Sequence, residues 1–134
     1  EFMMFRAVRT VQAAREVVLR SGAAKAAIVV DVLHLVRSGG SADDLARLEP
    51  RLIGAVQFCD APLAAPPDLA LEARERRLAP GEGALPLAAL LDAMGRGRDV
   101  DAEAPLAWAT PALSQLERAR LLRAATARVV AGAA

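Results

Sequence analysis

The chain has 134 residues, of which 54% are hydrophobic and 3% aromatic, enough for one domain with a core built mainly from aliphatic side chains. Seventeen basic and 16 acidic residues leave a net charge of +1, and no block of Lys and Arg is long enough to follow a phosphate backbone, which argues against nucleic-acid binding. No apolar run reaches the length of a membrane span, and the single Cys59 cannot form an internal disulfide. The sequence therefore predicts a cytoplasmic protein that binds neither nucleic acid nor membrane.

The chain begins with Glu1 and Phe2 ahead of two methionines, so residues 1–4 are interpreted as a vector-derived remnant and start, and residues 5–134 as a single domain. Valines at helical spacing predict an amphipathic helix over residues 5–20. Residues 26–34 form a short apolar run rich in β-branched side chains, a pattern typical of a strand buried on both faces of a parallel sheet.

The remaining chain alternates in the same way. Its expected elements are, in order, a helix over 41–48, a strand over 52–60, a proline-rich loop over 61–68, helical turns over 69–78, a turn at 80–83, a helix over 85–94, a weaker strand over 99–104 and a helix over 111–130. Strands that alternate with helices across short breaks imply parallel βαβ units and an α/β fold. Trp108, just before the last helix, is predicted to pack or to lie in an interface.

Polar side chains follow each expected strand. Asp31 and His34 come with the first strand, Gln57 and Asp60 with the second, and Glu103 with the third. The carboxyl ends of parallel strands face the functional crevice, and carboxylate, imidazole and amide groups that converge there can hold a divalent cation. Asp31 is expensive to bury unless it is paired or metal-bound. Asp60 can equally cap a turn, and His34 alone is more often an ordinary polar residue.

Four segments together resemble the second half of the xylose isomerase-like TIM-barrel superfamily, which includes sugar isomerases, epimerases, dehydratases and endonuclease IV-type enzymes. They are IVVDVLHLVRSGG at 28–40, VQFCDA at 56–61, RLAPGEG at 77–83 and AEAP at 102–105, which are similar to the sixth strand, the seventh strand, the loop after it and the eighth strand. The resemblance covers nearly the whole chain. It implies about half of a (β/α)8 barrel, with three to four parallel strands and flanking helices.

The resemblance also implies the roles of site residues. Asp31, Gln57 and Glu103 fall at positions of metal ligands, although many members have a histidine where this chain has Gln57. His34 matches a substrate-contacting histidine. The fourth ligand of the family, a glutamate on the fourth strand, is expected to have no counterpart. The expected cofactor is one divalent ion, with Zn2+ favoured over Mn2+.

Arg77 and Glu82, in and beside the Pro-Gly-Glu-Gly loop, are candidate substrate-binding residues at the rim of the pocket. Each also has a simpler interpretation, Arg77 as a solvated charge at the end of a helix and Glu82 as a turn residue. Cys59 is expected to be a buried small hydrophobe.

Three parallel strands cannot close a barrel, so their edges would leave backbone groups unpaired and apolar faces in water. We therefore expect a homo-oligomer, a dimer or a tetramer, formed through sheet edges or helix faces.

A truncated site with open coordination positions favours a metal-dependent hydrolase of activated phosphoesters such as phosphotriesters, with His34 or Asp60 as the assisting base. The first alternative is retained sugar isomerase, epimerase or dehydratase chemistry on a small-molecule substrate. The second is a fragment without catalytic activity that serves only for assembly.

Overall fold

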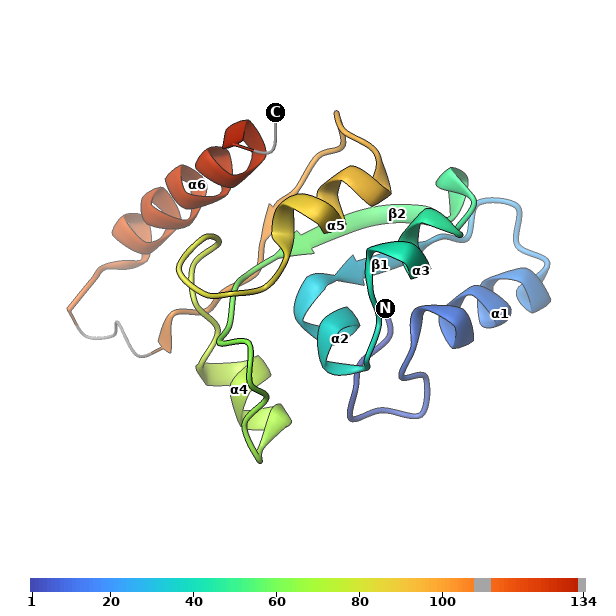
Figure 1. Cartoon of the computed structure of the whole chain (residues 1–134), viewed down its shortest axis with the longest axis horizontal. Helices are drawn as coiled ribbons and strands as arrows, with labels where there is room; N and C mark the ends of the chain where they lie inside the picture. Colours follow the sequence, from blue (N-terminus) through green and yellow to red (C-terminus); the bar gives the residue numbers. More distant parts are fainter. Residues whose placement is uncertain (108–111, 133–134) are drawn as a thin grey trace.

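The computed structural model describes residues 1–107 and 112–132 and shows a three-stranded parallel sheet flanked by helices (Figure 1). The elements in chain order are α1 (Val11–Ser21), β1 (Ile28–Asp31), α2 (Val32–Arg37), α3 (Ala42–Ala46), the 3-10 turn η1 (Pro50–Leu52), β2 (Ile53–Phe58), α4 (Leu69–Glu75), α5 (Leu87–Met94), β3 (Asp101–Ala102) and α6 (Gln115–Gly132). The predicted α/β alternation is confirmed. None of the described helices is both long and apolar enough to cross a membrane.

The sheet has the order β1-β2-β3, with β1 and β3 each paired in parallel to β2. The register aligns Asp31 with Gln57 and Gln57 with Asp101, so these side chains share one face of the sheet. Val56 and Phe58 point to the opposite face and are buried in the core. One face is therefore covered by helices, while the face with Gln57 is only partly buried.

The first strand is shorter than the sequence predicts. Residues 26–34 were expected to be one strand, but β1 ends at Asp31 and residues 32–34 begin α2. Asp31 has extended backbone angles, and its Oδ1 accepts hydrogen bonds from the backbone N–H groups of Leu33, at 2.8 Å, and His34, at 3.0 Å. The aspartate therefore stops the strand by capping the next helix.

Side-chain caps also set the starts of other helices. The first helix begins at Val11 rather than near residue 5, because Thr10 caps it and accepts a hydrogen bond from the Ala13 N–H at 3.2 Å. Asp68 caps α4 in the same way, accepting from the Leu71 N–H at 2.8 Å. The expected last helix begins at Pro111, which with Trp108 lies outside the described residues.

The helices form a layer around the covered face of the sheet, in which α3 packs on α5 and α5 on α6. The core contains almost exclusively aliphatic side chains, as the composition predicts, with Phe58 and Phe2 as its largest fully buried members. Phe2 has no exposed surface, so the first residues of the chain contribute to the core.

A buried ion pair ties α2 to α4. Arg37 donates to both carboxylate oxygens of Glu72, at 2.8 and 2.7 Å, and both side chains are 2% exposed. Arg37 also donates from Nη2 to the carbonyl oxygen of Pro62 at 2.7 Å and from Nη1 to that of Leu63 at 3.2 Å. The pair thus fixes the proline-rich loop and the two helices that flank the carboxyl end of β1.

Candidate functional site

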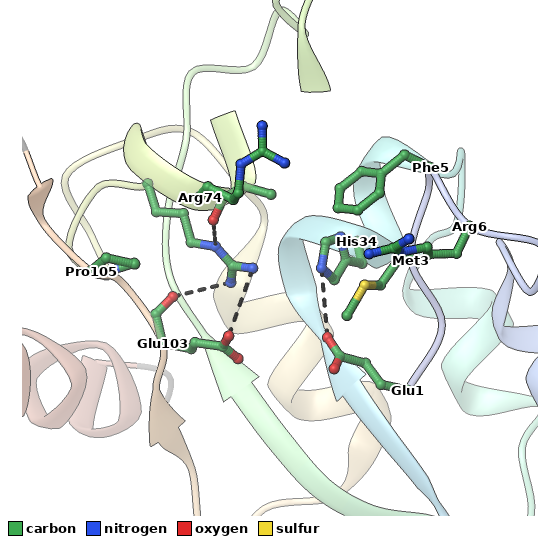
Figure 2. A pocket seen from close by; sticks show the side chains of 10 residues that line it. Glu1, Met3, Phe5, Arg6, His34, Arg74, Glu103 and Pro105 are labelled. Carbon is green, nitrogen blue, oxygen red and sulfur yellow. Dashed lines mark hydrogen bonds and ion pairs between the residues drawn. The ribbon is translucent and has the colours of Figure 1, made fainter. Parts of the chain in front are cut away.

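A pocket of about 520 Å3 opens at the carboxyl end of the sheet (Figure 2). Its lining comes from the N-terminal segment, α2, α4 and the chain after β3, and consists of Glu1, Met3, Phe5, Arg6, His34, Ala73, Arg74, Arg77, Glu103 and Pro105. Segments far apart in the sequence therefore meet where the parallel strands end, the usual place for a site in this class of fold.

Asp31 lies at the base of this region and is fully buried. Its Oδ1 caps α2, and its Oδ2 accepts a hydrogen bond from Nη1 of Arg77 at 2.5 Å. A buried carboxylate needs such partners because desolvation of an unpaired charge is costly. The expectation that Asp31 must be paired or metal-bound is met here by a guanidinium.

Arg77 joins the ends of β1 and β3. Besides Asp31, its Nη1 donates to the backbone carbonyl of Glu103 at 3.1 Å, and Nη2 lies 4.0 Å from Oε1 of Glu103. Burial alone would lower the pKa of Arg77, but the Asp31 carboxylate, together with Cys59 and Glu103, raises it overall. Arg77 is 4% exposed, so it is a charged group built into the site and not the solvated helix-end charge of the simpler interpretation.

His34 stands on the first turn of α2, beside Asp31. Its Nδ1 lies 2.7 Å from the sulfur of Met4, its Nε2 lies 3.6 Å from Oε1 of Glu1, and the ring of Phe5 packs edge-on against it with centroids 5.6 Å apart. Burial lowers the pKa of His34, opposed by Asp31 and assisted by Arg77. A neutral imidazole is the form that can bind a metal or accept a proton.

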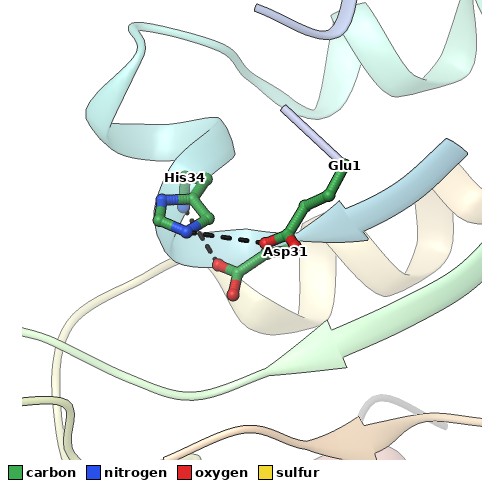
Figure 3. Close-up of side chains that lie close together, drawn as sticks. All are labelled: Glu1, Asp31 and His34. Atoms are coloured by element: carbon green, nitrogen blue, oxygen red, sulfur yellow. Dashed lines mark hydrogen bonds and ion pairs between the residues drawn. The ribbon is translucent and has the colours of Figure 1, made fainter. Parts of the chain in front are cut away.

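Glu1, Asp31 and His34 point toward one another and form a group of the kind that holds a divalent cation (Figure 3). One oxygen or nitrogen atom from each residue lies within 4.8 Å of the other two. Burial and the neighbouring Asp31 raise the pKa of Glu1, as expected where carboxylates crowd together. Two carboxylates and an imidazole are a common donor set for zinc or manganese.

Two further oxygens near the sheet end support the same interpretation. Oε1 of Gln57 and Oε2 of Glu103 are buried and have no hydrogen-bond partner among the described residues. Burial, and then the nearby Asp31, raises the pKa of Glu103, while Arg77 lowers it. Because buried polar atoms are nearly always satisfied, these oxygens suit a cation or a polar substrate. The residues present therefore fit a divalent metal.

Two predicted site residues lie elsewhere. Asp60 is buried, but its oxygens accept from the backbone N–H groups of Ala61, at 2.8 Å, and of Gly81 and Leu85, each at 3.0 Å. Asp60 therefore holds the Pro-Gly-Glu-Gly loop in place, which agrees with its alternative interpretation as a residue that caps a turn. Glu82 is exposed on that loop and does not line the pocket.

Cys59 is fully buried, as expected, with its sulfur 3.7 Å from Nη1 of Arg77. Burial raises the pKa of its thiol to about 12. A thiol of this kind remains protonated at neutral pH and does not act as a nucleophile.

The structure also adds residues that the sequence reasoning left out. Residues 1–4 are set apart from the domain as a vector-derived remnant and start in the sequence interpretation, yet in the structure Glu1 and Met3 line the pocket and Phe2 is fully buried. Phe5, expected in the first helix, also lines the pocket, and Arg74 joins it from α4. No periodicity marks the first residues. The only sequence signal for them is that a carboxylate, Glu1, and an aromatic residue, Phe5, stand close together near the start of the predicted amphipathic helix.

Comparison with solved structures defines the fold class. A crystal structure of IolI protein with a binding zinc atom aligns with a TM-score of 0.80 and 23% identity, covering 95% of this chain and 45% of that one. A xylose isomerase domain protein from Alicyclobacillus acidocaldarius aligns with a TM-score of 0.73 and 28% identity, covering 94% and 44%. A xylose isomerase-like TIM barrel/4-hydroxyphenylpyruvate dioxygenase fusion protein aligns with a TM-score of 0.64 and 25% identity, covering 77% and 18%.

The chain therefore has the fold of part of a xylose isomerase-like TIM barrel, as its motifs predict. It spans less than half the length of each of these structural neighbours. No protein-family model and no curated protein sequence matches the chain. Two of these neighbours are described as xylose isomerase-like or xylose isomerase domain proteins, and the IolI protein was solved with a binding zinc atom.

Proposed function

We propose that the pocket is the metal-binding part of a sugar isomerase-like active site, which catalyses proton transfer next to the carbonyl group of a small polyhydroxylated substrate. The outcome would be isomerisation, epimerisation or dehydration. The observation that carries the proposal is the convergence of Glu1, Asp31 and His34 within 4.8 Å at the carboxyl end of a xylose isomerase-like sheet. This reading replaces hydrolysis as the leading function, because the structural neighbours are sugar isomerase-like proteins.

Glu1, Asp31 and His34 would hold the ion, with Gln57 and Glu103 next to it. A divalent cation in this position supplies Lewis acidity that polarises substrate oxygens. Zinc is the preferred ion because the donor set includes an imidazole and a zinc-binding protein shares the fold.

The chain's own residues supply binding and proton handling. The unpartnered Oε2 of Glu103 can accept a proton, and the raised pKa of this carboxyl brings its basicity closer to neutral pH. Arg77 fixes the Glu103 backbone and Asp31 relative to each other, which keeps the acceptor oriented. Phe5 and Pro105 line the pocket with apolar surface that suits the carbon face of a sugar.

The second candidate is the hydrolysis of activated phosphoesters. Arg6 and Arg74 line the pocket beside the carboxylates, and guanidinium groups suit phosphoryl oxygens. This candidate requires the same metal group and differs only in the substrate that the pocket accepts.

The test begins with the metal content of the chain after dialysis against zinc or manganese. We expect about one ion per chain, lost in His34→Gln and Asp31→Asn and retained in the matched control Asp43→Asn, whose carboxylate is exposed on α3. Circular dichroism would verify that each variant is folded. Equal metal content in all four proteins would contradict the proposed ligands.

Substrate assays then separate the two functions. Keto-sugars and inososes test isomerisation, epimerisation and dehydration, and a phosphotriester tests hydrolysis. Turnover of the sugars alone, abolished by a chelator and restored by metal, supports the main proposal. Turnover of the phosphotriester alone would replace it with the second candidate.

A further inference from the structure

The two outer strands of the sheet, β1 and β3, run in the same direction, and each has one edge without a partner among the described strands. Within the described part of the chain, β1 and β3 are each paired only with β2. The Glu103 N–H donates to the Phe58 carbonyl at 2.8 Å, and successive backbone groups alternate across a strand, so the N–H and C=O of Ala102 point away from β2. The edge of β3 therefore offers backbone groups to one more parallel strand.

A groove of about 350 Å3 runs along this edge, between β3 and α6. Its lining consists of Val100, Asp101, Ala102, Ala119, Leu122, Arg123 and Thr126. Thr126 is 8% exposed, and its Oγ1 has no hydrogen-bond partner among the described residues. A buried, unpartnered hydroxyl on α6, in the groove beside the open edge of β3, is suited to an incoming polar group.

The side of α6 that lines this groove continues toward both ends of the helix. Leu116 and Val130 are 59% and 39% exposed, and they follow the groove residues Ala119, Arg123 and Thr126 at the helical spacing of three and four. These five residues, called the α6 stripe, run along most of the helix on the side that lines the groove, with apolar side chains at both ends.

The opposite end of the molecule carries a matching surface. A groove of about 510 Å3 on α1, beside β1, is lined by Val8, Ala13, Glu16, Val17, Arg20 and Ser21, and Val17 is 55% exposed. Figure 1 shows α1 and α6 at opposite ends of the molecule. Most of the exposed large hydrophobic side chains among the described residues therefore lie on the two helices at the ends of the sheet.

We infer that these two ends bind each other in a second copy of this chain. The β3 edge and the α6 stripe of one protomer pair with the β1 edge and the α1 face of the next, which continues the sheet in parallel and in the same direction. Two such contacts related by a two-fold axis close a ring of six strands and leave no open edge. The contact also brings Glu103 at the end of β3 toward the Asp31 end of β1 in the partner subunit, so each site gains a neighbour from the other copy.

Sedimentation velocity and light scattering on the full chain over a range of protein concentrations test this inference. We expect a particle of twice the 14.0 kDa chain mass. Leu116→Glu and Val17→Glu change exposed side chains in the two surfaces, so they should weaken the dimer at least about tenfold without unfolding the chain. The matched control Leu63→Glu changes a residue that is 70% exposed in the proline-rich loop, outside both surfaces, and should leave the dimer intact.

Ala102→Pro provides the backbone test. Proline is tolerated on an edge strand where the N–H faces outward, so the variant should keep the β2–β3 pairing and lose the dimer. A monomer at every concentration, a particle that keeps growing with concentration, or equal effects of Leu116→Glu and Leu63→Glu would overturn the inference. Metal content is measured separately, so a failed dimer and a failed metal site remain distinguishable.

Discussion

The protein has two buried arginine–carboxylate pairs, one at the carboxyl end of β1 and one between α2 and α4. They differ in which polar groups they leave available to a ligand. Arg37 and Glu72 form a closed pair, since both carboxylate oxygens accept from Arg37 and all three guanidinium nitrogens donate to protein groups. Arg77 and Asp31 form an open pair, because Arg77 also reaches Glu103 and lines the pocket. The same two chemical groups thus serve as a structural clamp in one place and as part of a site in the other.

The largest expected effect breaks the closed pair. Arg37→Met leaves the Glu72 carboxylate buried without its partner, and it should lower the free energy of unfolding by about 3–5 kcal/mol. Urea denaturation followed by circular dichroism measures this loss. The double variant Arg37→Met with Glu72→Leu removes both charges and should recover most of the stability. A double variant as unstable as the single one would show that the pair acts through its contacts with the loop instead.

A change in the open pair should weaken the binding of zinc. Asp31→Asn keeps an oxygen that can cap α2 but removes the carboxylate charge, so zinc affinity should fall about 10- to 100-fold or more. Titration calorimetry with zinc measures the change. Unchanged affinity would place the cation on other residues.

Asp60→Asn is the control for Asp31→Asn, because Asp60 is also a buried aspartate but lies outside the pocket. It removes an acceptor from the backbone N–H groups that hold the Pro-Gly-Glu-Gly loop, so unfolding free energy should fall by about 1–3 kcal/mol. Zinc affinity of the folded variant should equal that of the original chain. A loss of affinity comparable to that of Asp31→Asn would return Asp60 to the site.

The pH dependence of stability sharpens the role of His34. Burial keeps the pKa of His34 below its ordinary value of 6.5, so the unfolded chain takes up this proton at a higher pH than the folded one. The stability from this residue is complete above pH 6.5 and decreases as the pH falls toward the lowered pKa. His34→Gln should flatten the slope of unfolding free energy in that range. The raised pKa values of Glu1 and Glu103 act in the opposite direction and are common to both proteins.

The last prediction concerns chemical reactivity, at the thiol next to Arg77. Because the pKa of Cys59 is raised to about 12, its thiolate fraction is roughly a thousandfold below that of an ordinary thiol. A thiol-specific reagent at mildly alkaline pH should therefore react far more slowly with the folded chain than with the denatured one. Equal rates would show that the strand end opens readily to solvent.

Much of the fold could be predicted from the sequence, because it depends on local patterns. Short apolar runs ending in Asp31 and in the Gln57 segment predict parallel strands, and the structure confirms their order and direction. The early end of β1 could not be predicted from hydrophobicity, since it depends on whether the Asp31 side chain caps the next helix.

The candidate site was harder to predict from the sequence, because it is assembled from residues that are far apart in the chain. Asp31 and Arg77 are 46 residues apart in the chain, and no periodicity links them. Glu1 reaches His34 only through the packing of the first residues against the core, where Phe2 is fully buried. The polar residues at the strand ends could be picked out from the sequence, but which side chains lie next to them requires the tertiary structure.

The pairing register of β2 has a consequence for how such a site can change during evolution. Gln57 shares a face with Asp31 and Asp101, whereas Phe58 lies on the opposite, fully buried face. Deleting a single residue within Ile53–Val56 would exchange these faces, turning Gln57 into the core and Phe58 to the face that carries Asp31. Substitution at Gln57 changes one polar side chain at the strand end and leaves the sheet in place. Lineages carrying this fold can therefore vary their chemistry by exchanging side chains at the strand ends, while strand length is held constant by the core.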